Sequence, residues 1–222
     1  MHLYGLLIGI GVWVAYEIVR KFGKIEVKIL DELLWWILPA GIVVARAYHV
    51  IDYWQRYYKD NLLDIFKVWN GGLGIWGAII GGAMALLLFT KVKKIYFLEL
   101  FNCIVIGIPF AQAIGRLGNW ANGELYGKNG EPLFAYEAGL NILLGVILVY
   151  FARRKSGREN PAPTGGIYLI GYGVIRICLE NLRPEGIIWK VYGVPMAVVM
   201  GVISIILGIF LLNPSRLRRF SL

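Results

Sequence analysis

GRLGNWANGELYG, residues 115–127, follows directly on an apolar run that begins at residue 97. The run is close to the roughly 20 residues that a helix needs to cross the hydrocarbon core of a bilayer. The stretch after it sets an arginine, two asparagines and a glutamate between glycines. This change from apolar to polar predicts a membrane-spanning helix that ends in a polar cluster at the membrane boundary.

The composition of the 222-residue chain is that of an integral membrane protein. Hydrophobic residues make up 58% of it and charged residues 17%, whereas about 25% of residues in soluble domains are charged. The formal charge of +9 does not call for nucleic acid, because basic residues of membrane proteins gather in cytoplasmic loops and contact anionic lipids. Cys103 and Cys178 lie in apolar runs, so no disulfide framework is expected.

Apolar stretches of spanning length recur along the whole chain, and no soluble domain fits between them. Because backbone in hydrocarbon must satisfy its own hydrogen bonds, such stretches predict helices. The first stretch has no basic segment before it and no small-residue cleavage site after it, so we interpret it as a retained span and not as a cleaved signal peptide. We expect an all-α, polytopic membrane protein with seven transmembrane helices, folded as a single domain over residues 1–222. The spans are 3–19, 33–53, 72–90, 97–115, 135–152, 165–182 and 192–212.

Lysine and arginine are unevenly divided between the two sides of these spans. Of the 23 basic residues, 14 fall in one set of loops with the C-terminal tail, seven fall in the opposite loops, and Arg46 and Arg176 lie inside spans. Because cytoplasmic loops carry the excess of basic residues, the N-terminus is predicted outside and the C-terminus in the cytoplasm. Residues 115–127 then lie at the outer face.

A second outer loop, residues 54–71, is rich in tyrosine and tryptophan and contains the amphipathic piece LLDIFKVW. Such a piece is typical of a segment that lies in the lipid headgroup layer. An ordinary belt of interfacial aromatic residues explains the same composition. Glycine-rich runs inside the spans, such as GIYLIGYG at 166–173, allow close packing of helices.

Charged residues inside spans need a partner or a cavity, since each costs roughly 2.5–3.5 kcal/mol on insertion scales. Arg46, with His49 and Asp52 after it, either contacts a phosphate or headgroup from a cavity or extends outward to the interface. Arg176, Glu180 and Arg183 are spaced to line one helix face as an ion-pair ladder. The ladder is either structural or holds an anion through the arginine forks.

Within residues 115–127, the side chains that suit a phosphate ester with a polar headgroup are Arg116, Asn119, Asn122 and Glu124. A solvated glycine-rich turn is the structural alternative. With His2 and His49 as the only histidines and no CxxC, HExxH or phosphate-loop motif, no metal or cofactor is expected.

At these residues the chain resembles the bacterial prolipoprotein diacylglyceryl transferases, and GRLGNWANGELYG resembles their signature. The resemblance keeps its order along most of the chain and implies functional roles for Tyr4, Arg46 and Arg176. It also covers Tyr136 and Glu137 at the start of the family's fifth span. The matching segments are LYGLLIGIG at 3–11, GIVVARAYHV at 41–50, the segment 65–82, LFAYEAGLN at 133–141 and GYGVIRICLENLRPE at 171–185.

The resemblance implies a multi-pass enzyme of the bacterial cytoplasmic membrane that moves diacylglyceryl from phosphatidylglycerol to the lipobox cysteine of a prolipoprotein. It implies catalytic residues Arg116, Arg176, Glu124 and Tyr4, and no cofactor. The lipid-binding set that it implies is Arg116, Arg176, Asn119, Asn122, Glu124, Gly127, Arg46, Glu180 and Arg183.

The chain departs from the family at Trp76, where many members have a histidine. Indole cannot accept a proton at neutral pH, so the base that takes the thiol proton is left open between Glu124 and His49. A membrane transport protein, in which Arg46 and Arg176 line a route for an anion, is the rival interpretation, and a structural scaffold is a third. The scaffold gives no reason for the placement of the arginines.

Overall fold

The computed structural model describes residues 2–154 and 163–212, and gives only the backbone of His2, Tyr4 and Asn70. The chain divides into two compact units. The first consists of Met1–Ile25 with Leu98–Leu222, and the second of Glu26–Phe97.

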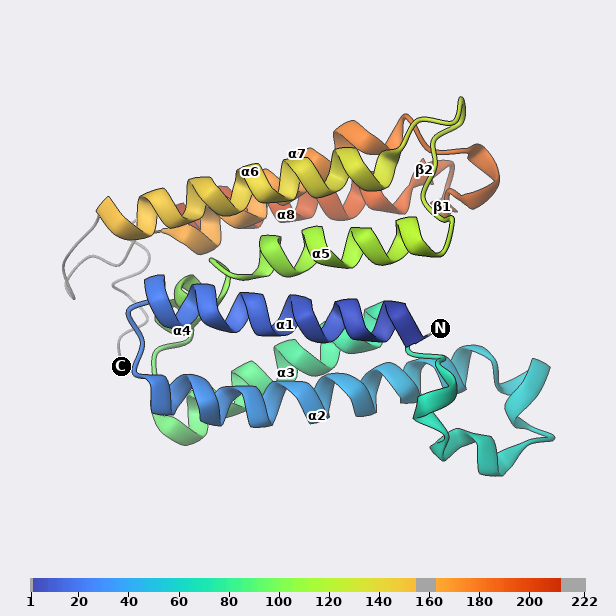
Figure 1. Cartoon of the computed structure of the whole chain (residues 1–222), viewed down its shortest axis with the longest axis horizontal. Helices are drawn as coiled ribbons and strands as arrows, with labels where there is room; N and C mark the ends of the chain where they lie inside the picture. The colour runs from blue at the N-terminus through green and yellow to red at the C-terminus, as the bar shows by residue number, and fades with distance from the viewer. Residues whose placement is uncertain (1, 155–162, 213–222) are drawn as a thin grey trace. The chain divides into compact units, whose positions relative to one another are not determined.

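The first unit is built from helices that each pack on the next one. Its elements are α1 (His2–Phe22), α4 (Phe97–Ile104), α5 (Ile108–Ala121), α6 (Leu133–Arg154), α7 (Thr164–Glu180), the short helix η4 (Glu185–Ile187), β1 (Lys190–Val191), β2 (Val194–Pro195) and α8 (Met196–Leu212). Helix α1 packs on α5, α5 on α6, α6 on α7, and α7 on α8 (Figure 1). Helix α6 therefore lies between α5, which carries Arg116, and α7, which carries Arg176.

Paired glycines bring α7 and α8 close together. A Cβ atom on Gly173 would lie 2.6 Å from the carbonyl oxygen of Gly201, and one on Gly208 would lie 2.7 Å from that of Gly166. The glycines are seven residues apart on each helix, so they face the partner helix at two successive levels. This confirms the expectation that glycine-rich runs serve close helix packing.

The helix predicted over 97–115 is wrong as one continuous span. Helices α4 and α5 are separated by residues 105–107 and bent by 47°. Pro109 lies in the first turn of α5, and a proline there has no N–H to donate to the preceding turn. Gly107 packs against the backbone of Ala15 in α1. Helix α5 then continues to Ala121, so the first half of GRLGNWANGELYG is helical and not a turn.

The start of α7 is held by Asn102 of α4. The Gly165 N–H donates to Asn102 Oδ1 at 2.8 Å, and the Thr164 hydroxyl donates to the Asn102 carbonyl oxygen at 2.5 Å. The first N–H groups of a helix have no acceptor within the helix. Asn102 therefore supplies one, and it fixes the N-terminal end of the helix that carries Arg176.

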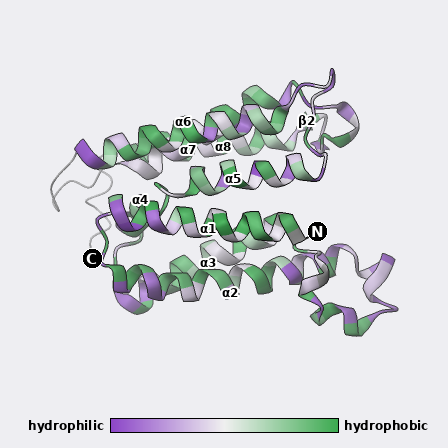
Figure 2. Cartoon of the chain, in the orientation of Figure 1, coloured by the Kyte–Doolittle hydropathy of each residue, from purple (hydrophilic) through white to green (hydrophobic). Residues whose placement is uncertain are grey.

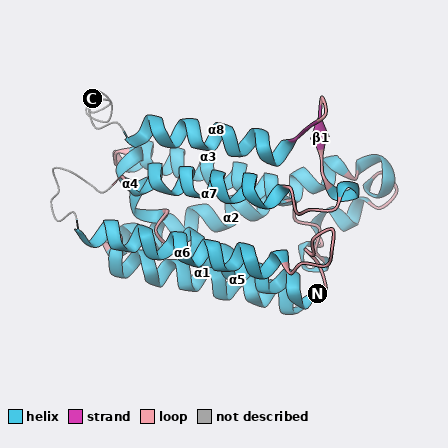
Figure 3. Cartoon of the chain, turned by 90° about the horizontal axis from the view of Figure 1, so that it is seen from above, coloured by secondary structure: helices cyan, strands magenta, loops and turns pink. Residues whose placement is uncertain are grey.

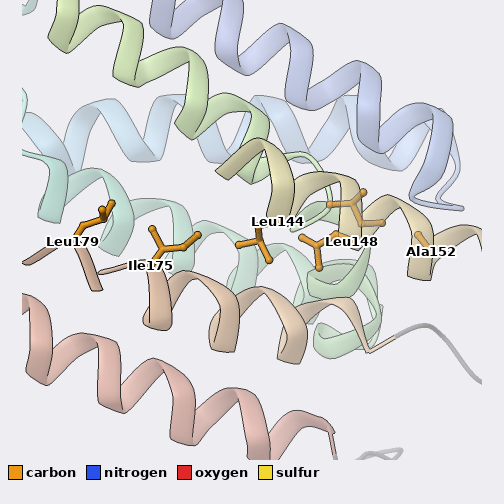
Figure 4. Close-up of a cluster of buried hydrophobic side chains, with 6 residues drawn as sticks. Leu144, Leu148, Ala152, Ile175 and Leu179 are labelled. Carbon is orange, nitrogen blue, oxygen red and sulfur yellow. The ribbon is translucent and has the colours of Figure 1, made fainter. Parts of the chain in front are cut away.

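The apolar core of this unit lies between α6 and α7. Leu144 and Leu148 project from one face of α6, and Ile175 and Leu179 project from the facing side of α7 (Figure 4). Residues four apart share a helix face, so each helix contributes one row. Ala152 and Ile106 complete the cluster.

The second unit is a pair of packed helices with an irregular segment between them. It consists of α2 (Val27–Asp52), the short helices η1 (Trp54–Tyr58), η2 (Leu62–Phe66) and η3 (Val68–Asn70), and α3 (Ile75–Lys93). Gly81 of α3 lies against the Ala40 carbonyl oxygen of α2, where a Cβ would be 2.5 Å away. The segment 53–74 extends from the end of α2 (Figure 1).

Several helices have the length and composition of membrane spans. Within the described residues, α3 and α6 each qualify by length and composition, α4 and α5 qualify together as a bent pair, which is either a broken span or a re-entrant loop, and α8 is a shorter apolar helix of 17 residues. Hydrophobic residues run along these helices, and hydrophilic ones gather near helix ends and in loops (Figure 2). The count of seven spans and the orientation of the termini stay predictions.

The helix predicted over 192–212 begins only at Met196, because a hairpin precedes it. Lys190 pairs with Pro195 and Val191 with Val194 around a turn at residues 192–193, both with positive φ. Two such residues form a turn whose twist matches that of the strands. In the described part of the chain, the fold is α-helical with this one small strand pair (Figure 3).

The glycine pairs give a test of the α7–α8 packing. We expect Gly173→Leu to lower the free energy of unfolding by about 1–3 kcal/mol, as overpacking does, because the Gly201 backbone cannot move aside. Thermal unfolding in detergent measures this. Gly139→Leu is the control, since a Cβ there meets nothing within 4 Å. Equal melting temperatures for the two variants would contradict the close packing.

Candidate functional site

A continuous polar network runs through α5, α6 and α7 of the first unit. It begins at Glu124, whose carboxylate accepts hydrogen bonds from Asn119 at 3.1 Å and from Asn122 at 3.5 Å. The Asn119 side-chain oxygen accepts a hydrogen bond from Arg116 at 3.0 Å. Ion pairs then continue the network through Arg116, Glu137, Arg176, Glu180 and Arg183.

Helix spacing places these groups together. Arg116 and Asn119 are three apart near the end of α5, and Arg176 and Glu180 are four apart near the end of α7, so each pair shares a face. Glu137 lies near the start of α6, which packs on both other helices. The ends of α5 and α7 therefore meet the beginning of α6.

Glu137 is the centre of the network. It is 1% exposed, and its Oε1 lies 2.8 Å from Nη2 of Arg116 while its Oε2 lies 3.7 Å from Nη1 of Arg176. A buried carboxylate is costly unless it is paired. Glu137 therefore gives each arginine one of its two oxygens.

The ion-pair ladder predicted on α7 is confirmed. Glu180 Oε2 lies 3.8 Å from Arg176 Nη2 and 3.6 Å from Arg183 Nε. These distances exceed hydrogen-bond lengths, so N–H groups of both arginines keep the capacity to donate to another acceptor. Burial, with Arg176 adding to it, lowers the pKa of Arg183, as expected where cations crowd together.

Several buried atoms of the network have no hydrogen-bond partner. These include Arg116 Nε, Glu137 Oε1 and Glu180 Oε2. Oε1 of Glu137 lies at ion-pair distance from Arg116, but no N–H points at it with hydrogen-bond geometry. Most buried polar atoms in proteins are hydrogen-bonded. The network therefore has unfilled hydrogen-bonding capacity, including a buried guanidinium donor that a bound anion could use.

The charge of the buried and half-buried part of the network is also positive. Arg116, Arg176 and Arg183 oppose Glu137 and Glu180, which leaves one net positive charge. Three guanidinium groups present planar donor forks that match phosphate oxygens. The arrangement suits a singly charged anion with oxygen acceptors.

The loop after α5 closes one side of the network. Glu124 is exposed and is held there by the two asparagines, and its backbone N–H donates to the Asn119 carbonyl oxygen at 2.8 Å. Gly127 is buried beside Glu131, and a Cβ on it would lie 3.0 Å from the Leu182 carbonyl oxygen. The Lys128 N–H donates to that same oxygen at 2.9 Å. Gly127 therefore lets this loop meet the segment that carries Arg183.

Prediction from the sequence did not assign a role in the site to Glu137, and it passed over two further polar residues. Asn141 is 0% exposed, and neither of its amide atoms has a partner. Gln112 donates to the Tyr168 hydroxyl at 3.0 Å. The sequence could have singled out all three residues, because each is polar and lies inside a predicted span, where burying a polar group costs free energy.

Arg46 belongs to the second unit, where backbone carbonyl oxygens surround its guanidinium. Nε donates to Ile65 at 2.9 Å, Nη1 to Gly71 at 2.6 Å and Gly72 at 3.1 Å, and Nη2 to Asp64 and, at 3.3 Å, to Lys67. Arg46 is 7% exposed, and its guanidinium lies over the Tyr58 ring. All of these acceptors lie in residues 64–72, which run from η2 through η3 toward α3. Arg46 therefore fastens that segment to the end of α2.

A pocket of about 230 Å³ lies beside Arg46. His49 lines it, stacked on Tyr53 with ring centroids 4.5 Å apart and with Nδ1 3.2 Å from the Tyr58 hydroxyl. The Tyr57 hydroxyl donates to Asp64, and Lys67 Nζ lies 2.6 Å from the same carboxylate. These hydrogen bonds, that of Lys67 first, lower the pKa of Asp64.

The remaining predicted residues are placed as follows. Trp76 lies in the first turn of α3 and is partly buried. Tyr4 is in α1, but its side chain lies outside the described residues. Within residues 2–154 and 163–212, no three His, Cys, Asp or Glu side chains form a group that could hold a metal ion.

Comparison with known proteins gives a consistent set of similarities. A family model described as prolipoprotein diacylglyceryl transferase matches residues 1–213. Three curated relatives carry the name phosphatidylglycerol--prolipoprotein diacylglyceryl transferase. The one from Finegoldia magna is 37% identical, with 83% of this chain and 79% of the relative covered. The one from Clostridioides difficile is 32% identical (93% and 87%), and the one from Listeria monocytogenes is 30% identical (94% and 84%).

The carbonyl contacts of Arg46 predict the effect of Arg46→Lys. The ammonium group of a lysine is compact and cannot donate to all the carbonyl oxygens that the planar guanidinium of Arg46 reaches. One lost charged hydrogen bond is worth about 1.5–3 kcal/mol. We expect backbone amides of residues 61–74 to exchange hydrogen at least about tenfold faster. Arg56→Lys, at an exposed arginine of η1, serves as the control. Unchanged exchange in Arg46→Lys would show that the segment is held by other contacts.

Proposed function

Because the chain belongs to the prolipoprotein diacylglyceryl transferase family, we propose that it transfers the diacylglyceryl group of phosphatidylglycerol to the thiol of a prolipoprotein lipobox cysteine. The transfer is the first step of bacterial lipoprotein maturation. The enzyme acts as a multi-pass protein of the cytoplasmic membrane, with seven spans and with residues 115–127 at the outer face. The charge distribution of the loops supports this orientation.

The observation that carries the proposal is the pair of arginines held on either side of Glu137. A phosphodiester such as phosphatidylglycerol carries one negative charge, which balances the net positive charge of the buried network. Arg116 Nε, buried without a partner, and the N–H groups of Arg176 are available to its oxygens. Binding the lipid phosphate would therefore satisfy both the charge and the hydrogen bonds of the site.

In the reaction, the sulfur of the peptide thiol attacks the diacylglycerol carbon that bears the phosphate ester. A C–S bond forms, the C–O bond breaks, and glycerol phosphate leaves with its electron pair. The leaving phosphate gains a second negative charge as the bond breaks. Arg116 and Arg176 stabilise that charge, as preorganised donors do where charge develops in a transition state.

The other residues orient the substrates. Glu180 lies between Arg176 and Arg183 and steadies both. Asn119, Asn122 and Gly127 shape the headgroup side of the site, and Tyr4 closes it. Glu124, the exposed carboxylate of the network, takes the thiol proton. Arg46 supports lipid binding through the segment 61–74 that it holds.

A product measurement separates this function from anion transport, which the bent pair α4–α5 would also suit. Purified protein is incubated with phosphatidylglycerol and a lipobox peptide, and the peptide is weighed by mass spectrometry. We expect a peptide that is heavier by one diacylglyceryl group. Lipid binding or flux without a covalent product would favour transport.

Loss of either arginine fork should remove most of the activity. For Arg116→Ala and Arg176→Ala we expect kcat/KM to fall by about 10²–10³, the typical effect of removing one such electrostatic donor. Initial rates of peptide modification measure it, with the folded state checked by gel filtration in detergent. Near-normal turnover by both folded variants would exclude the arginine clamp.

Trp76 stands where many family members have a histidine, and the proposal does not use it as a base. Trp76→Phe keeps an aromatic side chain without the indole N–H, so we expect it to retain most of the activity in the same assay. A loss as large as that of the arginine variants would make the indole itself functional.

A further inference from the structure

One carboxylate bridges the two arginines of the site from opposite sides. Glu137 contacts Arg116 of α5 with one oxygen and Arg176 of α7 with the other, and it is itself on the helix between them. Its side chain is 2% exposed, whereas those of the two arginines are 25% and 18% exposed. The carboxylate is therefore more deeply buried than the two arginine side chains, which form the more exposed part of the site.

Two guanidinium groups in one half-buried site repel each other, and this repulsion is strong where water is scarce. Placing a carboxylate between them offsets the repulsion and fixes where each fork lies. Asn119 constrains Arg116 from the α5 side, and Glu180 constrains Arg176 along α7. Glu137 is the link of the network that joins the two halves.

The contacts of Glu137 leave the arginines able to bind. Only the Arg116 contact, at 2.8 Å, has hydrogen-bond length, and the Arg176 contact of 3.7 Å does not. Arg116 Nε points to no partner, although it is buried. Glu137 therefore orients both cations without occupying all of their donors.

We propose that Glu137 is a positioning residue, which sets the spacing of Arg116 and Arg176 for the phosphate of the substrate and does not itself touch the reacting atoms. This rests on the proposed transferase function. Because Glu137 also repels an anion, it weakens ground-state binding of the lipid while it preserves the geometry that stabilises the leaving phosphate. The two effects act in opposite directions on binding and on turnover.

Glu137→Gln tests this, since it keeps the shape and removes the charge. We expect kcat to fall by about 10², while the Kd and KM for phosphatidylglycerol decrease, because the site gains one net positive charge. A purely structural defect would instead lower the fraction of active protein and leave the Kd unchanged. Kd is measured by equilibrium binding of phosphatidylglycerol in detergent, and kcat and KM by the peptide-modification assay.

A second variant keeps the test decisive if Glu137→Gln fails to fold. Glu137→Asp keeps the charge but shortens the reach, so we expect an unchanged Kd, an unchanged fraction of protein that binds the lipid, and a kcat below that of wild type. A purely structural defect would instead lower the fraction of protein that binds the lipid, and a wild-type kcat would contradict the positioning role. Glu185→Gln, at an exposed glutamate after α7, is the control and should match wild type in every value.

Two results would overturn the proposal: wild-type kcat in Glu137→Gln, or a lower kcat with an unchanged or higher Kd. The peptide-modification assay on the wild-type protein tests the transferase function separately. If wild type produces no modified peptide, that function is rejected. The binding measurement needs no turnover, so it tests the predicted effect of Glu137 on lipid binding whether or not the chain is a transferase.

Discussion

The arrangement of the first unit depends on one interaction, the ion pairing of Glu137 with arginines from two different helices. Charges are costly where they are shielded from water, and a chain that brings two half-buried guanidinium groups together needs a counter-charge between them. Glu137 supplies it from the helix between them. The apolar rows of α6 and α7 pack against each other along the same two helices (Figure 4). Ile175 and Leu179 directly precede Arg176 and Glu180 in α7, so the apolar cluster and the ion pairs hold the same part of that helix.

Helix α7 is constrained on several sides, which bears on function because an electrostatic site works best when its dipoles are already in place. Asn102 holds its N-terminal end, glycine contacts bring it close to α8, and the ion pairs hold its C-terminal end. In the second unit, Arg46 performs a comparable task for an irregular segment by satisfying its carbonyl oxygens. Arginine side chains thus have two roles in this chain. Arg46 supports backbone carbonyl groups, and we propose that Arg116 and Arg176 bind an anion.

Much of this could be predicted from the sequence, since apolar runs located the helices and helical spacing gave the Arg176–Glu180–Arg183 ladder. The break before α5 was signalled by Pro109 but hidden by the apolar run around it. The insertion-cost argument, applied to the arginines, would also have selected Glu137. Its two partners could not be predicted, because they depend on which helices pack on α6. The acceptors of Arg46 are backbone carbonyls, which leave no mark on residue identity.

The proposed site holds a phosphate between Arg116 and Arg176, with Glu137 paired to both arginines. The most direct measurement is an experimental structure with phosphatidylglycerol bound, at a resolution that locates the phosphorus atom. The account predicts phosphate oxygens within about 3.2 Å of guanidinium nitrogens of both arginines, and Glu137 still beside both. A phosphate that contacts neither arginine, or one bound elsewhere while the arginines stay paired only with carboxylates, would contradict it.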